Sequence, residues 1–208
     1  TSCALYLPLY KLPGAVFNSR DRNAFLCTNV GSVWTPQGRS FDGVDDRIDT
    51  ADIDIVGDMT LEAWVKLKIK TAHQYLIAKR DDSDFTTPLN LIYNFTLDAF
   101  RFVLGGGGTD ATAATGRANI AVNRWHHVVG TISGTAVVMY TNGVGGTPAA
   151  FVGTQQTNNL VVRLGGPYTN GLTDYMFNGL ISECSIYTRA MSAQEVMNRY
   201  LARKGKYV

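Results

Sequence analysis

The sequence predicts an all-β protein, a sandwich of two antiparallel sheets with one short helix near its C-terminal end. Three observations carry this prediction. Stretches of alternating or β-branched residues recur at intervals of about 10–15 residues between turn residues. Glycine is frequent, with 21 of 208 residues, and Thr, Val, Asn and Tyr recur throughout. Helical periodicity occurs only once, and no linker or internal repeat divides residues 1–208, so a single domain is expected.

The expected strands begin with residues 4–10, which alternate and are aromatic, and Pro8 places that strand at an edge or a bulge. Residues 11–40 are polar and broken by Gly and Pro, so irregular structure is expected there. The glycine-rich residues 105–116 lack the Gly-Lys-Ser/Thr ending of a phosphate loop and are expected to form a flexible loop. Further strands are expected at 47–50, 59–69, 75–80, 89–97, 99–105, 124–133, 136–143, 160–166 and 176–187.

The helix is predicted from its N-terminal signals. Ser192 is followed three residues later by Glu195, which is the spacing of a capping box. Met191 before the cap and Val196 at the fourth helical position are placed to form a hydrophobic staple. Residues 199–208 carry four basic residues and no acid. This charge complements the helix macrodipole, or alternatively it docks a partner subunit.

Charge and composition exclude several classes of protein. With 19 basic and 17 acidic residues the chain has a net charge of +2, too small to attract nucleic acid. No apolar run approaches the ~20 residues of a membrane span, and no signal peptide is visible, although the missing initiator Met suggests a trimmed N-terminus. The three cysteines, Cys3, Cys27 and Cys184, form neither a disulfide framework nor a zinc motif. Either they are buried free thiols, or two are bridged and one is left over.

The stretch SFDGVDDRI, residues 40–48, raises the question of a metal site. It holds Asp42, Asp45 and Asp46, with Gly43 directly after the first. Glycine adopts backbone conformations closed to other residues, and aspartate side chains satisfy the donors of a turn. Turn chemistry is therefore one interpretation, and calcium, which prefers several carboxylate oxygens, is the other.

Four stretches in order carry a family resemblance: SFDGVDDRI, MTLEAWVKL, RWHHVVGTISGTAVVMYTNG and NGLISECSIYTRAMSAQEV. Together they resemble the laminin-G-like domains of the concanavalin A-like jelly rolls. Each motif alone is weak, but their order and spacing are specific. The resemblance implies a jelly-roll sandwich. It also implies a possible structural calcium at Asp21, Gly43 and Ser182, although the family usually has aspartate where Ser182 stands, and serine brings no charge.

Two sets of residues are candidates for catalysis or zinc binding. His126 and His127 are adjacent on a strand, so they point to opposite faces, one inward and one outward, and cannot chelate one ion. Asp52 and Asp54 would lie about 6.5–7 Å apart on one strand face, a separation compatible with glycoside hydrolysis. The glucanases that the chain resembles use a Glu-x-Asp-x-Glu pattern, which is absent here, and we expect no enzymatic activity.

The resemblance implies recognition, adhesion or assembly. We expect a non-catalytic module, extracellular or on a virion surface, that binds carbohydrate or a protein partner. The alternative is a structural surface protein, such as a virion decoration or fibre subunit, that assembles as a homo-oligomer or on a capsid. A degenerate glycoside hydrolase is a remote alternative.

Sugar binding would use aromatic side chains for stacking, with amides and carboxylates on the hydroxyl groups. The most site-like segment is 165–175, which is polar and carries two tyrosines outside clear strand pattern. Each aromatic is also a candidate for packing in the core or at its rim. The predicted binding residues are Tyr168, Asn170, Asp174 and Tyr175, and the further aromatic candidates are Tyr75, Tyr93, Phe95 and Phe100.

Overall fold

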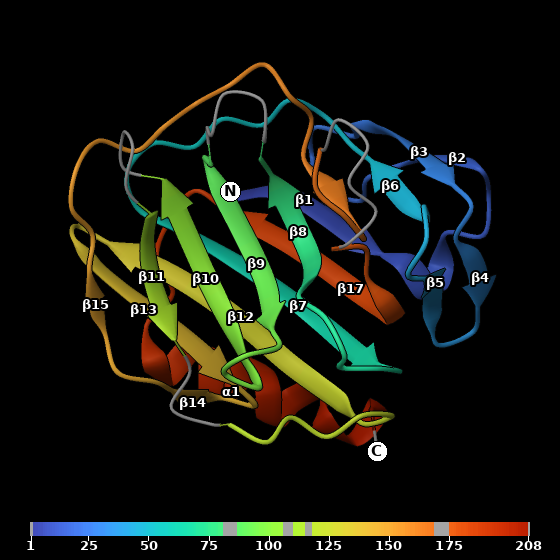
Figure 1. Cartoon of the computed structure of the whole chain (residues 1–208). Coiled ribbons are helices and arrows are strands. Elements are labelled where there is room, and N and C mark those ends of the chain that lie inside the picture. The colour runs from blue at the N-terminus through green and yellow to red at the C-terminus, as the bar shows by residue number, and fades with distance from the viewer. Residues whose placement is uncertain (1, 81–86, 106–109, 115–117, 169–174, 208) are drawn as a thin grey trace.

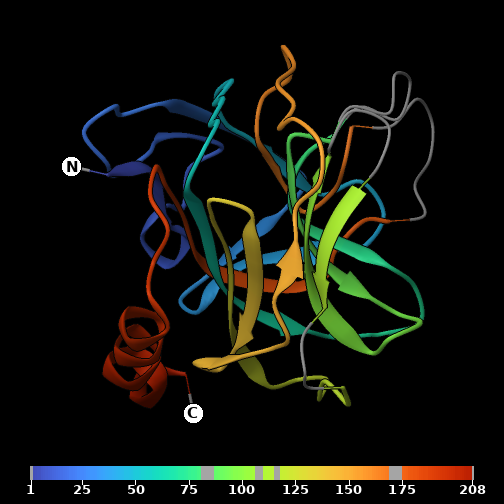
Figure 2. The same cartoon turned by 90° about the vertical axis from the view of Figure 1, so that its left-hand side faces the viewer.

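The computed structural model consists of two antiparallel sheets packed face to face, with one α-helix on the outside of one of them (Figures 1 and 2). It describes residues 2–80, 87–105, 110–114, 118–168 and 175–207. The predicted sandwich with a single C-terminal helix is confirmed.

The nine-stranded sheet is built around the three longest strands, which are also the clearest in the sequence. These are β7 (Met59–Leu67), β12 (Trp125–Ser133) and β17 (Asn178–Tyr187), and β7 lies between the other two. The sheet order is β14-β13-β12-β7-β17-β5-β4, with β1 paired to β17 and β15 paired to β13. Its remaining members are β1 (Cys3–Pro8), β4 (Val33–Thr35), β5 (Gly38–Asp42), β13 (Ala136–Thr141), β14 (Val144–Gly145) and β15 (Ala149–Ala150).

The eight-stranded sheet forms the other layer, in the order β11-β10-β9-β8-β16-β6-β3-β2. Its centre is formed by the neighbouring strands β8 (Gln74–Lys79), β9 (Leu89–Asn94) and β10 (Ala99–Gly105). The other strands are β2 (Val16–Asn18), β3 (Leu26–Val30), β6 (Arg47–Asp49), β11 (Asp110–Ala114) and β16 (Arg163–Leu164).

Three expectations about the chain were wrong. Residues 11–40 are not irregular, because β2 to β4 and the start of β5 lie within them, after a 3₁₀ turn at Leu9–Lys11. Residues 110–114, within the expected loop, form a strand, β11, while 106–109 and 115–116 lie outside the described residues. The strand expected at 160–166 shrinks to β16. The short strands have two to five residues and little alternation, and they are held by pairing with neighbouring strands. Their own sequence is a weak signal for that reason.

The core lies between the sheets, and strand alternation decides which side chains enter it. On β9, Leu89, Leu91 and Tyr93 belong to the core, so Asn90 and Ile92 face outward. The corresponding outward residues of the neighbouring strands gather in a separate small cluster on the outer face of this sheet. That cluster comprises Tyr75, Ala78, Ile92 and Val103, with Tyr175 packed against it.

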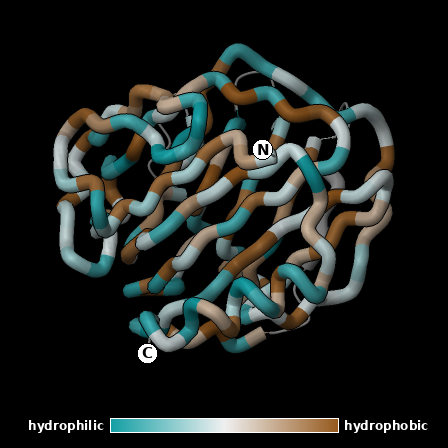
Figure 3. The backbone as a smooth tube through the Cα atoms, turned by 180° about the vertical axis from the view of Figure 1, so that it is seen from behind, coloured by the Kyte–Doolittle hydropathy of each residue, from teal (hydrophilic) through white to brown (hydrophobic). Residues whose placement is uncertain are grey.

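The predicted helix, α1 (Ala193–Arg203), covers the outer face of the nine-stranded sheet (Figures 2 and 3). Its capping box is confirmed, because the Ser192 hydroxyl accepts from the Glu195 amide at 3.2 Å while the Glu195 carboxylate accepts from the Ser192 amide at 2.8 Å. Met191 and Val196 are buried with Val129 of β12. The last turn continues as a 3₁₀ helix, Lys204–Lys206.

Among the described residues, no helix has the length and apolar character needed to cross a membrane.

All three cysteines are free thiols. Cys27 and Cys184 are buried, and Cys3 is half-buried. Burial raises the pKa of Cys27 to about 11 and raises that of Cys184 further, so these thiols are inert at neutral pH. Of the two sequence interpretations, the one with unbridged cysteines is the one observed.

Candidate functional site

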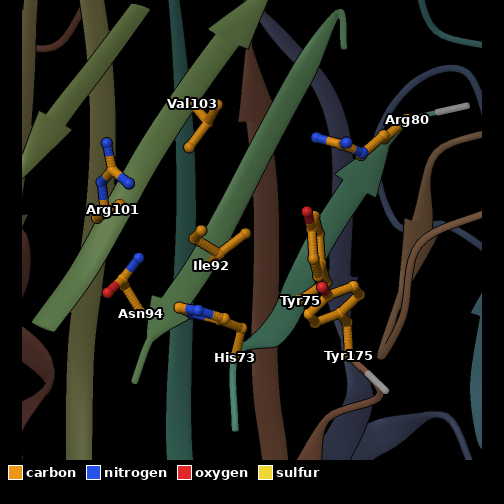
Figure 4. Close-up of a pocket in the computed structure, with 8 residues that line it drawn as sticks. All are labelled: His73, Tyr75, Arg80, Ile92, Asn94, Arg101, Val103 and Tyr175. Carbon is orange, nitrogen blue, oxygen red and sulfur yellow. The ribbon is translucent and has the colours of Figure 1, made fainter. Parts of the chain in front are cut away.

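A pocket of about 200 Å³ lies on the outer face of the eight-stranded sheet, over its central strands (Figure 4). Ile92 of β9 and Val103 of β10 form an apolar floor, and aromatic and polar side chains stand around them. The lining residues are His73, Tyr75, Arg80, Ile92, Asn94, Arg101, Val103 and Tyr175.

Two tyrosines form one wall of the pocket. Tyr75 faces outward from β8, and its backbone amide donates to the Tyr175 carbonyl at 3.0 Å, which fixes residue 175 beside the strand. The two rings lie 5.8 Å apart in an edge-to-face arrangement. The edge-to-face arrangement is one of the favoured geometries of aromatic pairs. The wall therefore presents a fixed aromatic surface to whatever enters the pocket.

The polar groups of the pocket are oriented by the turn between β9 and β10. The Phe95 amide donates to Nδ1 of His73 at 3.2 Å, which leaves Nε2 as the donor nitrogen of that ring. The Leu97 amide donates to Oδ1 of Asn94 at 2.9 Å, which leaves the Asn94 NH₂ group as a donor. Asp98 holds the turn with a positive φ of 46° and binds Lys70 at 2.7 Å. These bonds hold the polar groups in place before any ligand arrives.

Arg80 and Arg101 complete the rim from opposite sides of the pocket (Figure 4). With His73 they make the described part of the lining basic, and no carboxylate occurs among those lining residues. The pocket can therefore stack an apolar ring face, donate several hydrogen bonds and accommodate negative charge. Its described residues lack the paired carboxyl groups that glycoside hydrolysis requires.

The structure divides the predicted aromatic candidates. Tyr75 and Tyr175 line the pocket, whereas Tyr93 and Phe100 belong to the core. Phe95 is 49% exposed and packs edge-on against His73 beside the pocket.

A further predicted binding residue, Tyr168, is not among the described residues that line the pocket. Tyr168 follows β16, and the Arg163 guanidinium stacks on its ring at 3.7 Å. Arg163 pairs with Ala78 of β8, so Tyr168 lies near the outer face of the same sheet as the pocket. The predicted Asn170 and Asp174 are outside the described residues.

The polar lining of the pocket was missed from the sequence. His73, Arg80 and Arg101 lie at strand ends or singly on strands, where a polar residue is unremarkable. The signal that was available is the pattern of β9, LNLIYN, in which asparagine occupies outward positions of an otherwise apolar strand. Such positions on a face without a covering helix are candidates for binding.

The structure does not bring the three proposed calcium ligands together. Gly43 packs against Asn178, at the start of β17. Asp21 accepts from the Tyr6 amide at 2.9 Å, and Tyr6 pairs with Ser185, near the other end of that strand. At the rise of a β-strand these two positions are about 20 Å apart, too far to share one ion.

Ser182, the third proposed ligand, is fully buried at a bulge in β17. Its hydroxyl oxygen lies 3.1 Å from the hydroxyl group of Tyr207, which also donates to Glu183 at 2.7 Å. The serine that replaces the family's usual aspartate is thus part of the contact between β17 and the C-terminal segment.

The SFDGVDDRI stretch forms the turn between β5 and β6. The Asp42 side chain accepts from the Val44 amide, and the Asp46 side chain accepts from the Asp42 amide, both at 2.8 Å. Gly43 has φ +83°, the conformation for which glycine was predicted. Carboxylate oxygens of Asp42, Asp45 and Asp46 lie within 4.8 Å of one another. Two of the three already satisfy turn donors, as the turn interpretation predicts.

Asp52 and Asp54, the acids considered for hydrolysis, bind a lysine instead. The Lys79 side chain is fully buried, and its ammonium contacts Asp52 at 2.5 Å and also contacts Asp54. Both carboxylates are about two-fifths exposed. The lysine reaches them from the end of β8, so the acids act as counter-ions for a buried charge.

The outer face of the nine-stranded sheet is closed by a network of buried charges. Glu62 of β7 accepts from His127 at 2.8 Å and from Arg199 of α1 at 2.5 to 3.0 Å. His126 and His127 point to opposite faces as predicted, but both are buried, because the helix covers the outward one. A second acid, Glu183, binds Arg203 and, at 2.9 Å, Lys206.

The network shows what the basic C-terminal segment does. Three of its four cations neutralise two acids on the sheet beneath, which the sequence did not indicate. This face is therefore occupied by the chain itself. The pocket described above lies on the outer face of the other sheet, the eight-stranded one.

Comparisons with known proteins agree with this architecture. Trypanosoma rangeli sialidase in complex with sialic acid is similar over 98% of this chain, with TM-score 0.75 and 17% identity, although the chain spans only 33% of the sialidase's length. Domain 4 of AbnA, a GH43 extracellular arabinanase from Geobacillus stearothermophilus in complex with arabinotriose, is similar over 95% of this chain and 97% of its own, with TM-score 0.71 and 17% identity.

At these identities the structural likeness establishes the fold alone. The curated protein sequences give no match to the chain. The model of one family, described as the concanavalin A-like lectin/glucanases superfamily, matches residues 42–197. That match covers most of the chain, from the SFDGVDDRI turn into the C-terminal helix, and the chain belongs to this superfamily.

Proposed function

We propose that the chain is a non-catalytic carbohydrate-binding module, with the pocket over β8 to β10 as its sugar site. The observation that carries the proposal is the pocket's composition: two fixed tyrosines, Tyr75 and Tyr175, beside an apolar floor, with oriented donors around it. A sugar ring has an apolar C–H face and a rim of hydroxyl groups. Ring stacking and convergent hydrogen bonds match those two features.

The size and charge of the pocket narrow the ligand class. At about 200 Å³ it is smaller than the sites of roughly 300–1,000 Å³ that hold drug-sized ligands, so it suits a single sugar unit. His73, Arg80 and Arg101 are compatible with an acidic sugar as well as a neutral one. Sialic acid and arabinotriose are the ligands named for the two solved structures, which supports sugar as the class without choosing between them.

Two observations support a binding module over a hydrolase. The described lining residues include no carboxylate to serve as acid, base or nucleophile. The acid pair suggested by the sequence, Asp52 and Asp54, is engaged with Lys79. Binding without turnover is the activity we assign, with an extracellular location, where glycans are displayed.

The test is a glycan screen by thermal shift, followed by titration of any sugar that raises the melting temperature. Tyr175→Ala and Tyr75→Ala are each expected to weaken the binding of that sugar about tenfold or more, because each removes half of the aromatic wall. Tyr10→Ala is the matched control, since this half-buried tyrosine lies near Lys206, away from the pocket. Equal affinity in the wild type and both pocket variants would refute the assignment of the site.

Assembly through a second copy of the chain is the second candidate function. The edge strands β2 and β4 end the two sheets on the same side of the molecule (Figure 1). Val16, Leu26 and Val33 on or beside them are each more than half exposed, and an exposed edge with apolar side chains is a surface for strand pairing. A structural role at a particle or virion surface would use this edge.

Light scattering separates the two candidates. For the binding module we expect a monomer of 22.7 kDa, with or without sugar. A defined oligomer that Leu26→Glu dissociates would instead support assembly through the β2 edge.

A further inference from the structure

The amide of Asn90 is a buried polar group without a partner in the described part of the chain. Asn90 is 1% exposed, and among the described residues neither its Nδ2 nor its Oδ1 has a hydrogen-bond partner. An amide offers two donors and two acceptor lone pairs, and leaving such a group unsatisfied in a protein interior costs about 1–3 kcal/mol. Buried polar groups in folded proteins are nearly always bonded, so an exception calls for a ligand or an ordered water.

Asn90 lies next to the proposed sugar site. On β9 it is two residues before Ile92, the centre of the pocket floor, and both face outward, about 7 Å apart along the strand. Its neighbours across the sheet are Ala78 on β8 and Val103 on β10, and Val103 also lines the pocket. Ala78 has no side chain beyond its Cβ. The amide therefore has apolar neighbours on both flanking strands.

We infer that Asn90 is the specificity-determining residue of this site and binds two neighbouring hydroxyl groups of one sugar ring. One hydroxyl accepts from Nδ2 and the adjacent one donates to Oδ1, so a vicinal pair satisfies both atoms of the amide at once. Neither a lone carboxylate nor an apolar ring satisfies both. The inference rests on the proposed function and names its ligand class as a sugar with adjacent free hydroxyls.

Access to the amide passes beside Arg80. The Arg80 side chain extends from the end of β8 toward Val103 (Figure 4). Because Asn90 is the residue of β9 that pairs with Val103, this side chain crosses the level of Asn90. Arg80 has interactions of its own, so moving its side chain carries a cost that the hydrogen bonds to the buried amide must offset. A sugar in the pocket reaches Asn90 by moving the Arg80 side chain aside.

Asn90→Leu tests the inference, because leucine has nearly the same shape and no polar atom. Removing an unsatisfied amide is expected to raise the melting temperature of the free protein, while the affinity for the sugar found in the screen falls about tenfold or more. Gln74→Leu is the matched control. Gln74 is also 1% exposed, but both its amide atoms are bonded, at 2.9 Å, to Ile69 and Asn178, so its replacement is expected to lower the melting temperature.

A second readout uses sugars that each lack one hydroxyl group. The wild type is expected to bind one or two of these deoxy analogues about tenfold more weakly than the parent sugar, and Asn90→Leu to bind them and the parent sugar equally. Unchanged affinity in Asn90→Leu, with binding lost in Tyr175→Ala, would overturn this inference and leave the proposed function standing. A drop in melting temperature like that of Gln74→Leu would mean that water satisfies the amide, and would also overturn it. Absence of any sugar binding by the wild type overturns both.

Discussion

Glu62→Ala is expected to lower the free energy of unfolding by about 3–5 kcal/mol, among the largest effects of any single substitution in this chain. Glu62 is 2% exposed at the centre of β7, where it accepts from His127 and Arg199. Removing the carboxylate leaves the Arg199 guanidinium against a buried sheet face without its counter-ion. Urea unfolding at pH 7, followed by tryptophan fluorescence, measures the loss.

The same carboxylate gives the protein a defined acid sensitivity. Burial alone would raise the pKa of Glu62, but the hydrogen bonds and charges of His127 and Arg199 outweigh it and lower the pKa to about 2, from an ordinary 4.5. A depressed pKa means that the stabilisation is complete above about pH 4.5 and is lost as the pH falls toward 2. The difference in unfolding free energy between wild type and Glu62→Gln is expected to shrink by about 3 kcal/mol as the pH falls from about 4.5 to about 2.

Glu195→Gln is the control for burial. Hydrogen bonds from Arg189 and Ser192 lower the pKa of Glu195 to about 2 as well, yet this acid is exposed to solvent on the first turn of α1. Solvent screens such pairs, so the free energy of unfolding of Glu195→Gln should be close to that of the wild type. Equal losses of unfolding free energy in Glu62→Gln and Glu195→Gln would contradict the view that burial makes the ion pair of Glu62 strongly stabilising.

The sequence predicted the elements whose signals are local. Strands β7, β12 and β17 are long and alternate, and the caps of α1 depend on Ser192 and Glu195, three residues apart. The superfamily was recognised from motifs on these same elements. The short strands β2 to β5 and β11 were missed because they have only three to five residues and show little alternation of their own.

The site was predicted less well than the fold, because it is formed by positions far apart in the chain. Tyr175 was chosen for its loop, and the structure places it in the pocket, but its partner Tyr75 had been only one of several aromatics. Asn90 was not singled out, although asparagine at outward positions of the apolar strand β9 was an available signal, because its burial and its lack of a partner among the described residues are known only from the structure. Likewise, the cations of residues 199–208 were expected to complement the helix macrodipole or to dock a partner subunit, whereas Arg199 binds Glu62, 137 residues away in sequence.

The double substitution Asp52→Ala/Asp54→Ala is expected to destabilise the protein by about 3 kcal/mol, more than the sum of the two single changes. The Lys79 ammonium is fully buried and contacts both carboxylates. Either acid alone still provides a counter-ion, whereas losing both leaves an uncompensated buried charge. Denaturant unfolding of the two single variants and the double variant measures this coupling.

Adding Lys79→Met to the double variant is expected to restore most of the stability, because an apolar chain of similar length fills the same space without a charge. The triple variant also decides how an activity assay should be interpreted. If Asp52 and Asp54 were catalytic, any hydrolysis of sugar would be lost even in the stable triple variant. Hydrolysis lost only in the double variant would be explained by unfolding. Failure of Lys79→Met to restore stability would show that the acids hold the loop by contacts other than the buried lysine.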